Sequence, residues 1–205
     1  TAMFKISSQL QDIALKNLRP TQLTVGRREV EAKRREWADL PAKRRQHDMS
    51  EQLFPAAKGP KDHFYILDHH HLALALLREG VKNVRVGLVT DLSHLSLDDF
   101  WIYLDHRNWV HCYDEKGMRQ SFDSVPKAFD HLRDDPFRSL AASVQELGGF
   151  AKSDEPFLEF LWANHFRRHI PLEGLEENYE RALGQGLKLA HLAQSRHLPG
   201  WSGTK

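Results

Sequence analysis

The chain has 205 residues, of which 40% are hydrophobic and 28% charged, with a formal net charge of +1. This composition is typical of a soluble globular protein, gives the whole molecule no strong pull toward nucleic acid, and contains no apolar run of the roughly 18 residues that a membrane helix needs. With a single cysteine, Cys112, and no signal-peptide core in the first ten residues, we expect a cytoplasmic protein without an internal disulfide, a cysteine-based zinc site or a membrane partner.

The first third of the chain alternates strand-like and helix-like segments. A short strand is predicted over residues 12–15, followed by a loop that turns at Pro20 and closes at Gly26. Residues 27–40 have apolar side chains near helical spacing and predict a helix. The prolines and glycine within residues 42–61 predict a long connection.

A strand–helix–strand unit follows. "HFYILD" (residues 63–68) is a compact apolar strand, "HHLALALLREG" (residues 70–80) is a helix that ends at its glycine, and "VRVGLVTDL" (residues 84–92) is the next strand. Such a unit is most simply a right-handed βαβ crossover between parallel strands.

The second half of the chain is predicted to be mainly helical. Ser96 begins a helix that ends near Asn108, and residues 109–120 form a hairpin that turns at Lys116 and Gly117. Further helices are expected over residues 139–149, with Ser139 as the cap, 153–169 and 174–197, before a loose tail. We therefore expect an α/β (α+β) fold, with an α/β domain over residues 1–95 and a mainly helical region over residues 96–200 that packs on it as one compact unit.

Asp68 and three histidines, His69 to His71, stand where a strand passes into a helix. Asp68 could accept an N-cap hydrogen bond from the amide near His71, which is ordinary capping. The free amides and the helix dipole also make an anion site there, and partly protonated histidines would add to it. Consecutive histidines cannot all point one way, so a metal would have at most two of them, with Asp68 and His70 as the candidate ligands. Phosphate binding, metal binding and simple packing stay open.

Two further pairs of residues have both a binding and a structural interpretation. Thr21 and Gln22 either contact a ligand opposite the histidine turn or only shape their proline-led loop. Arg138 and Ser139 gather a guanidinium, a hydroxyl and free amides at one place. The alternative is that the aspartates at 134–135 hold Arg138 in an ion pair that ties the helical half to the sheet.

A basic run lies between Arg27 and Arg45, with eight Lys/Arg and four Asp/Glu. It could follow a DNA backbone, but interleaved acids favour a solvated helix face. Trp162 and Phe166 are expected in the core rather than on a base-stacking surface. Cys112 is expected to be buried.

Three segments in this order resemble the ParB-like nuclease family of bacterial proteins, within the ParB/sulfiredoxin superfamily. They are "LRPTQLTVG" (18–26), "YILDHHHLALAL" (65–76) and "DDPFRSLAASVQELGGFAKSDEPFLEFLWANHFR" (134–167). The resemblance implies a small mixed sheet with a βαβ unit of ParB/sulfiredoxin type. It also implies that the histidine turn holds the phosphates of a nucleotide or a reacting phosphoryl group.

The resemblance places Asp68, His70 and His71 on the aspartate and two histidines of the superfamily motif. His69 stands where relatives have glycine, and Leu72 stands where they have the arginine that binds phosphate.

Two residues of the superfamily, the glutamate base and the phosphate-binding arginine, have no direct counterpart in this chain. Kinase-type relatives have a glutamate base after the loop proline, and Gln22 takes that place here, although an amide cannot accept a proton in that role. Glu29 or Glu31 could reach in instead, and Arg138 is the candidate replacement for the missing arginine.

The resemblance therefore implies a protein that binds a nucleotide, with Mg²⁺, or another phosphate compound. Its reaction would be phosphodiester hydrolysis, as in a nuclease, or phosphoryl transfer. His70 and His71 would contact phosphate, Asp68 would fix the turn or bind a divalent ion, and Thr21 with Gln22 would orient the ligand. The alternatives are a non-catalytic DNA- or partner-binding module that has lost the phosphate arginine, and a metal-dependent nuclease that uses the histidines directly. The oligomeric state is left open.

Overall fold

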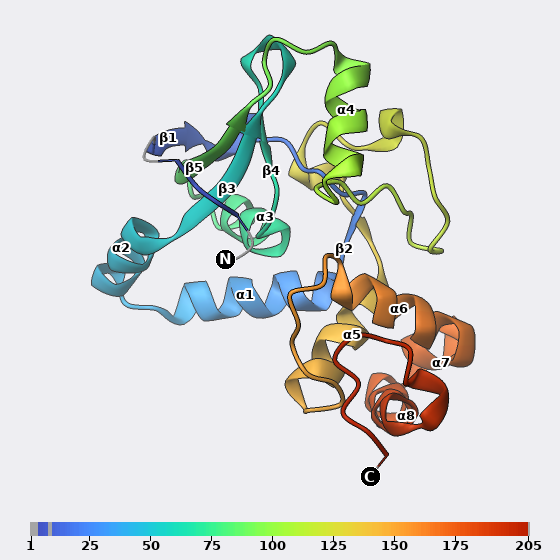
Figure 1. The fold of residues 1–205 in the computed structure, drawn as a ribbon. Helices are drawn as coiled ribbons and strands as arrows, with labels where there is room; N and C mark the ends of the chain where they lie inside the picture. The colour runs from blue at the N-terminus through green and yellow to red at the C-terminus, as the bar shows by residue number, and fades with distance from the viewer. Residues whose placement is uncertain (1–3, 8–9, 205) are drawn as a thin grey trace.

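The computed structural model describes residues 4–7 and 10–204, and it places a small sheet above a group of helices (Figure 1). The strands are β1 (Leu10–Ala14), β2 (Thr24–Val25), β3 (Leu53–Lys58), β4 (Phe64–Ile66), β5 (Asn83–Asp91) and β6 (Arg133–Asp134). The main sheet has the order β1–β5–β3–β4, with β3 and β5 parallel and the two outer pairs antiparallel. Strands β2 and β6 form a separate parallel pair. The expected mixed sheet in an α+β fold is confirmed.

The predicted βαβ unit is right in its elements and wrong in its pairing. β4, helix α3 (His70–Arg78) and β5 follow one another, but β4 pairs antiparallel with β3, which separates it from β5 in the sheet. The parallel pair is β3 and β5, so the crossover between them contains both β4 and α3.

The missing strand, β3, lies in residues 42–61. A connection was predicted there wrongly, from Pro55, Gly59 and Pro60. The carbonyl of Pro55 accepts a hydrogen bond from the amide of Leu67 on the β4 side. In a strand the N–H and C=O of one residue point to the same side, so the N–H that proline lacks would also have pointed away from β5. The ladder with β4 begins only at Ala56, and β3 therefore tolerates this proline.

The α-helices are α1 (Arg27–Asp39), α2 (Ala42–Glu51), α3 (His70–Arg78), α4 (Leu97–His106), α5 (Pro136–Glu146), α6 (Leu158–His169), α7 (Leu172–Glu177) and α8 (Tyr179–His191). Helix α4 stands beside the sheet in the upper part of the molecule, and α1 and α5 to α8 form its lower part (Figure 1). Short 3₁₀ turns lie at Leu15–Asn17, Pro60–Asp62, Phe122–Ser124, Phe129–His131 and Ala193–Ser195. The hydroxyl of Ser96 accepts from the amide of Asp99 at 3.1 Å, which confirms the predicted cap of α4.

Several predicted helix boundaries are corrected. Asp135, not Ser139, caps α5, because Pro136 fits the first helical turn and the Asp135 carboxylate accepts the next free amides. The helix predicted over residues 153–169 begins only at Leu158. The last predicted helix is two helices, because Asn178 interrupts it and caps α8.

Of two loop predictions, the turn at Gly117 is confirmed and the loose tail is wrong. The turn at Gly117 is present, closed by hydrogen bonds to Asp114, but only a single bridge between Tyr113 and Arg119 flanks it. The tail is not loose up to residue 204: Trp201 pairs with Phe150, and the region packs on the helical core. Lys205 and residues 1–3 and 8–9, which include part of the segment considered for a signal peptide, lie outside the described residues.

Three apolar clusters hold the fold together. One lies between the sheet and helices α1 and α3, a second joins α5 to α8, and a third packs α4 on Tyr65 and its neighbours. The second cluster includes Trp162 and Phe166, as expected, and Cys112 is buried in the third. The first cluster draws in Phe129 and Leu132, so its packing crosses residue 95, the predicted end of the α/β domain. Among the described helices, none combines the length and apolarity required to cross a membrane.

Candidate functional site

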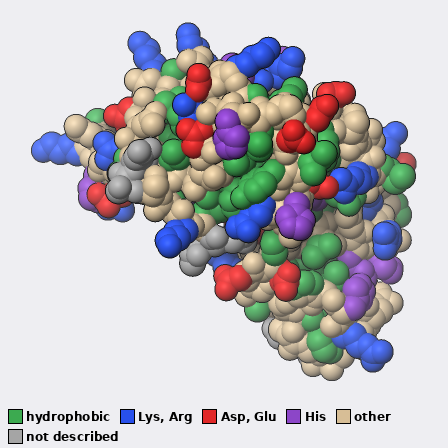
Figure 2. Space-filling model, turned by 45° about the horizontal axis from the view of Figure 1, so that its top comes forward, with side chains coloured by type: hydrophobic (Ala, Val, Ile, Leu, Met, Phe, Trp, Pro, Cys, Tyr) green, Lys and Arg blue, Asp and Glu red, His purple; other side chains and the backbone are tan. Residues whose placement is uncertain are grey.

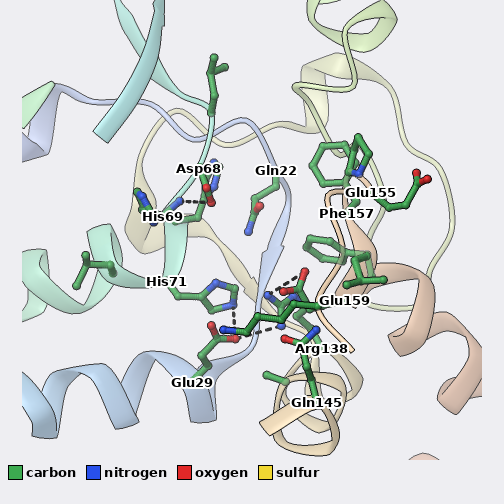
Figure 3. A pocket seen from close by; sticks show the side chains of 18 of the residues that line it. Gln22, Glu29, Asp68, His69, His71, Arg138, Gln145, Glu155, Phe157 and Glu159 are labelled. Carbon is green, nitrogen blue, oxygen red and sulfur yellow. Dashed lines mark hydrogen bonds and ion pairs between the residues drawn. The ribbon is translucent and has the colours of Figure 1, made fainter. Parts of the chain in front are cut away.

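A cleft of about 730 Å³ opens where the start of α3 faces α5 and the start of α6 (Figure 3). Six of the eight predicted site residues line it, and Thr21 and Ser139 do not. The six are Gln22, Asp68, His69, His70, His71 and Arg138. The structure therefore brings together residues from the loop before α1, the start of α3 and helix α5.

The start of α3 has no side-chain cap. His69 is the N-cap residue, with a left-handed backbone (φ 65°), and Asp68 accepts only from the adjacent His69 amide at 2.6 Å, not from the amide near His71 as predicted. The first intrahelical hydrogen bond joins Ala73 N–H to the His69 carbonyl. The three amides before Ala73 therefore have no partner inside the helix, and amides of this kind are the ones that bind anions at helix starts.

The backbone at His69 explains why relatives have glycine at this position. Glycine reaches the left-handed region at little cost, whereas histidine adopts it with strain, so glycine is the natural residue at this turn. The His69 ring packs edge-on against Phe54 at 5.9 Å, and burial lowers its pKa. The side chain of His69 thus belongs to the packing under the turn more than to the cleft.

His70 and His71 are neutral, which differs from the expected partial charge. The amide of Thr21 donates to His70 Nε2 at 3.0 Å, and the amide of Gly26 donates to His71 Nε2 at 2.9 Å. Burial lowers the pKa of His70 from its ordinary value to about 3 and the pKa of His71 well below its ordinary value. With Nε2 acting as an acceptor, each ring has its proton on Nδ1, and that N–H is the donor a ligand could meet.

These two rings connect the 21–26 loop to the start of α3. Thr21 is buried and its hydroxyl donates to the carbonyl of Ile66 at 2.8 Å, so it supports the wall instead of facing the ligand. Ser139 is buried against Gly26, where a Cβ would lie 2.8 Å from the Ser139 amide nitrogen. Both residues hold the loop in place from behind the cleft.

Arg138 faces the cleft, and its guanidinium is not bound by the aspartates at 134–135. Its Nη1 donates to Glu29 Oε2 at 3.1 Å, its Nη2 lies 3.9 Å from Glu159 Oε2, and only 8% of the side chain is exposed. The buried Nε has no partner among the described residues. Asp135 pairs with Arg167 instead, so the predicted clamp by the aspartates is wrong. Arg138 does form an ion pair between the two halves of the chain, but its partner is Glu29 of α1.

Glu29 is the cleft residue that the sequence did not single out from its neighbours. Its Oε2 lies 3.1 Å from Arg138 Nη1 and 3.4 Å from His71 Nε2 (Figure 3). Because the Gly26 amide already points at His71 Nε2, this nitrogen carries no proton, and the contact with Glu29 is not an ion pair. Glu31 points elsewhere, to Arg34 and Arg78. The one sequence signal for Glu29 was its place in the first turn of α1, directly after the loop.

The cleft carries more negative than positive side chains. Three cations line it: Lys33, Arg138 and Lys152. Six carboxylates line it: Glu29, Asp68, Glu146, Asp154, Glu155 and Glu159. Among the described residues there is no group of three or more His, Cys, Asp or Glu arranged to hold a metal ion by itself. An anionic ligand would therefore rely on hydrogen bonds and on a cation that it brings with it.

Some cations of the basic run in α1 and α2 have partners within the protein. Arg34 pairs with Glu79, Arg44 pairs with Asp48, and Arg28 lies 3.8 Å over the ring of Tyr179. On the face shown in Figure 2, basic and acidic side chains are mixed. These contacts agree with a solvated helix face, and binding of DNA there stays a prediction.

Comparisons with known proteins agree with this region of the chain. The family described as "Putative ParB-like nuclease" matches residues 11–168. Among solved structures, protein Atu1540 from Agrobacterium tumefaciens is 44% identical, with a TM-score of 0.91 over 96% of this chain and 98% of that one. No curated protein matches the chain. The matched residues contain the histidine turn, Glu29, Arg138 and Glu159, and every lining residue of the cleft except Phe4 lies within the family region.

Proposed function

Because the chain belongs to the ParB-like nuclease family, we propose that its cleft binds a nucleotide, or a related phosphodiester, with a phosphate at the start of α3. The observation that carries this proposal is the uncapped start of α3, which opens into a cleft that Arg138 also lines. An exposed helix start with free amides is an anion site. A buried guanidinium with an unpaired Nε supplies a second donor.

The two neutral histidines support binding in a different way from the one expected. Their Nδ1–H groups can donate to phosphate oxygens, although they add no charge. The rings are fixed by backbone amides at 3.0 and 2.9 Å, so no reorganisation is needed when a ligand arrives. In this proposal His70 and His71 bind phosphate as preorganised donors.

The excess of carboxylates fits a nucleotide that enters with Mg²⁺. Magnesium at phosphates uses one or two protein carboxylates and keeps several waters, so it needs no cluster of three ligands. Asp68 and Glu29 are the carboxylates beside the start of α3. Asp68 is the proposed protein contact of the metal, and Glu29 is left for the reaction.

The proposed reaction is phosphodiester hydrolysis or phosphoryl transfer, with Glu29 as the proton acceptor. Gln22 lacks a basic group, and its amide nitrogen is held by the Thr24 carbonyl at 2.7 Å. Glu29 is the carboxylate that lies next to both His71 and Arg138. The protein would act mainly by positioning and by neutralising charge.

Thermal unfolding with ATP, ADP and CTP, each with and without Mg²⁺, tests this proposal. A ligand at a hundred times its Kd adds about 2.7 kcal/mol of stability. We expect a magnesium-dependent rise in Tm that Arg138→Gln reduces and that Arg44→Gln, a change at an exposed ion pair on α2, leaves in place. No rise with any nucleotide would contradict the proposal.

A second candidate is a non-catalytic module that binds DNA or another partner. It is favoured by Leu72 at the motif arginine position and by Arg138, whose charge is already balanced by Glu29. Release of phosphate from nucleotides and cleavage of DNA separate the two. Activity that disappears in the double variant His70→Ala/His71→Ala supports the enzyme, and nucleotide binding without turnover supports the module.

A further inference from the structure

Two phenylalanines of the cleft lie outside the apolar cores. Phe157 and Phe160 both line the cleft, and neither belongs to any of the three core clusters formed by the described residues. Their neighbours are different: the buried ring of His111 stacks on Phe160 at 3.8 Å, and the guanidinium of Arg138 lies 5.4 Å over that same ring. The faces of Phe160 are therefore used within the protein.

Phe157 is in the opposite situation. It is half-buried, and its ring contacts Phe160 and His111 at centroid distances of 6.2 and 4.9 Å. Its backbone is left-handed (φ 58°), which is unfavourable for a bulky aromatic residue. The next residue, Leu158, enters the core, so the strained turn turns the chain inward while the Phe157 ring stays at the wall of the cleft (Figure 3).

Two polar side chains near this ring present acceptor oxygens. Gln22 pairs with His111 through a backbone bridge. Its side-chain nitrogen donates to the Thr24 carbonyl, so its side-chain oxygen remains as an acceptor for a ligand. Glu159, in the first turn of α6, lies 3.9 Å from Arg138 Nη2, beyond hydrogen-bond distance. A ligand at this wall would meet one aromatic face with hydrogen-bond acceptors beside it.

We propose that Phe157 is the stacking platform for a nucleobase, and that Glu159 accepts a hydrogen bond from an exocyclic amino group of that base. The inference rests on the proposed function, since the phosphates of the same ligand lie at the start of α3. It defines the ligand class as nucleotides whose base carries an amino group, such as adenine or cytosine, over uracil. The nucleotide then bridges the α/β half and the helical half of the chain.

The test compares ATP, UTP and tripolyphosphate, each with Mg²⁺, on the full chain by thermal unfolding and calorimetry. Tripolyphosphate has the phosphates without a base, so it reports on the α3 wall alone. Stacking supplies about tenfold in affinity per base, and Phe157→Leu should lose that factor for ATP while Phe157→Tyr keeps it. Leu161→Ala, an exposed residue of α6 that does not line the cleft, is the matched control. Glu159→Leu, which has no acceptor, should remove a preference of about tenfold for ATP over UTP.

The outcomes separate the two proposals. ATP tighter than UTP and tripolyphosphate, with the advantage lost in Phe157→Leu and kept in Phe157→Tyr and Leu161→Ala, supports the base site. Equal binding of all three probes, unchanged in Phe157→Leu, overturns the base site and leaves the phosphate site standing. If none of the three binds, the proposed function fails and the base site fails with it.

Discussion

The two walls of the cleft are built in opposite ways. On the α3 wall, the rings of His70 and His71 are buried and each accepts a hydrogen bond from a backbone amide of the 21–26 loop. On the α6 wall, which comprises residues 152–160, the side chains of Lys152, Asp154 and Glu155 make no hydrogen bond or ion pair with other described residues. The first wall holds fixed donors, and the second offers exposed charges and the half-buried ring of Phe157. Such a division suits a ligand with an invariant phosphate end and a variable end.

The largest expected effect is the sensitivity of the α3 wall to acid. Burial lowers the pKa of His70 from 6.5 to about 3 and that of His71 well below 6.5. Below pH 6.5 the unfolded chain binds protons that the folded chain excludes, so the free energy of unfolding falls as the pH falls. The loss is up to about 1.4 kcal/mol per pH unit for each histidine, until the pH reaches the folded pKa. Urea unfolding between pH 7 and pH 4 measures it.

A single variant assigns this acid sensitivity to the wall. His70→Gln keeps an acceptor for the Thr21 amide but has no titrating group, so its stability should fall less steeply with pH. His47→Gln, at an exposed histidine of α2, should keep the steep slope of the wild type. Equal slopes in all three proteins would show that His70 takes up its proton in the folded state.

The next largest effect is expected from Gly26→Ala, which disrupts the fixed wall from behind. The new Cβ would lie 2.5 Å from Ser139 Oγ and 2.8 Å from its backbone nitrogen, and overpacking of this kind costs about 1–3 kcal/mol. Gly184→Ala, in α8, meets nothing within 4 Å and should stabilise the protein by up to about 1 kcal/mol, because alanine is the better helix residue. Urea midpoints of the two variants that move in the same direction would contradict this close packing.

His71→Ala removes one connection between the loop and α3. It leaves the Gly26 amide buried without an acceptor, which costs about 1–3 kcal/mol. His47→Ala should change stability by less than about 0.5 kcal/mol, since that histidine is exposed. Chemical denaturation compares them, and a stable His71→Ala protein would mean that water replaces the ring.

The same contrast explains what could be predicted from the sequence. The histidine turn is local, so a strand-to-helix transition and a motif at Asp68 were enough to locate it. The charge state of His70 could not be predicted from neighbouring residues, because its partner amide at Thr21 lies 49 residues away in the chain. Glu29 and Phe157 reach the cleft only through the packing of α1 and α6, and no local pattern distinguishes them from other helix-start residues.

The fold shows the same limit. Helices with clear caps and spacing, such as the one after Ser96, were predicted well because their signals are local. Strand β3 was missed because a strand tolerates a proline only where no neighbour needs the missing N–H. Which side of Pro55 faces β5 is set by the pairing of the sheet, not by the local sequence. The parallel pairing of β3 with β5 could not be inferred once that strand was absent from the prediction.

The smallest expected effects come from the two carboxylates that flank Arg138, one from each wall. Glu29 Oε2 lies 3.1 Å from the guanidinium and is mostly buried, so Glu29→Gln loses a charge-assisted hydrogen bond and should cost about 1–2 kcal/mol. Glu159 lies at 3.9 Å with a third of its side chain exposed, and Glu159→Gln should change stability by less than about 0.5 kcal/mol. Urea unfolding of the two isosteric variants, which differ only in the wall they alter, measures this difference. If Glu159→Gln costs as much as Glu29→Gln, the α6 wall is as fixed as the α3 wall, and Glu159 is not free to accept from a ligand.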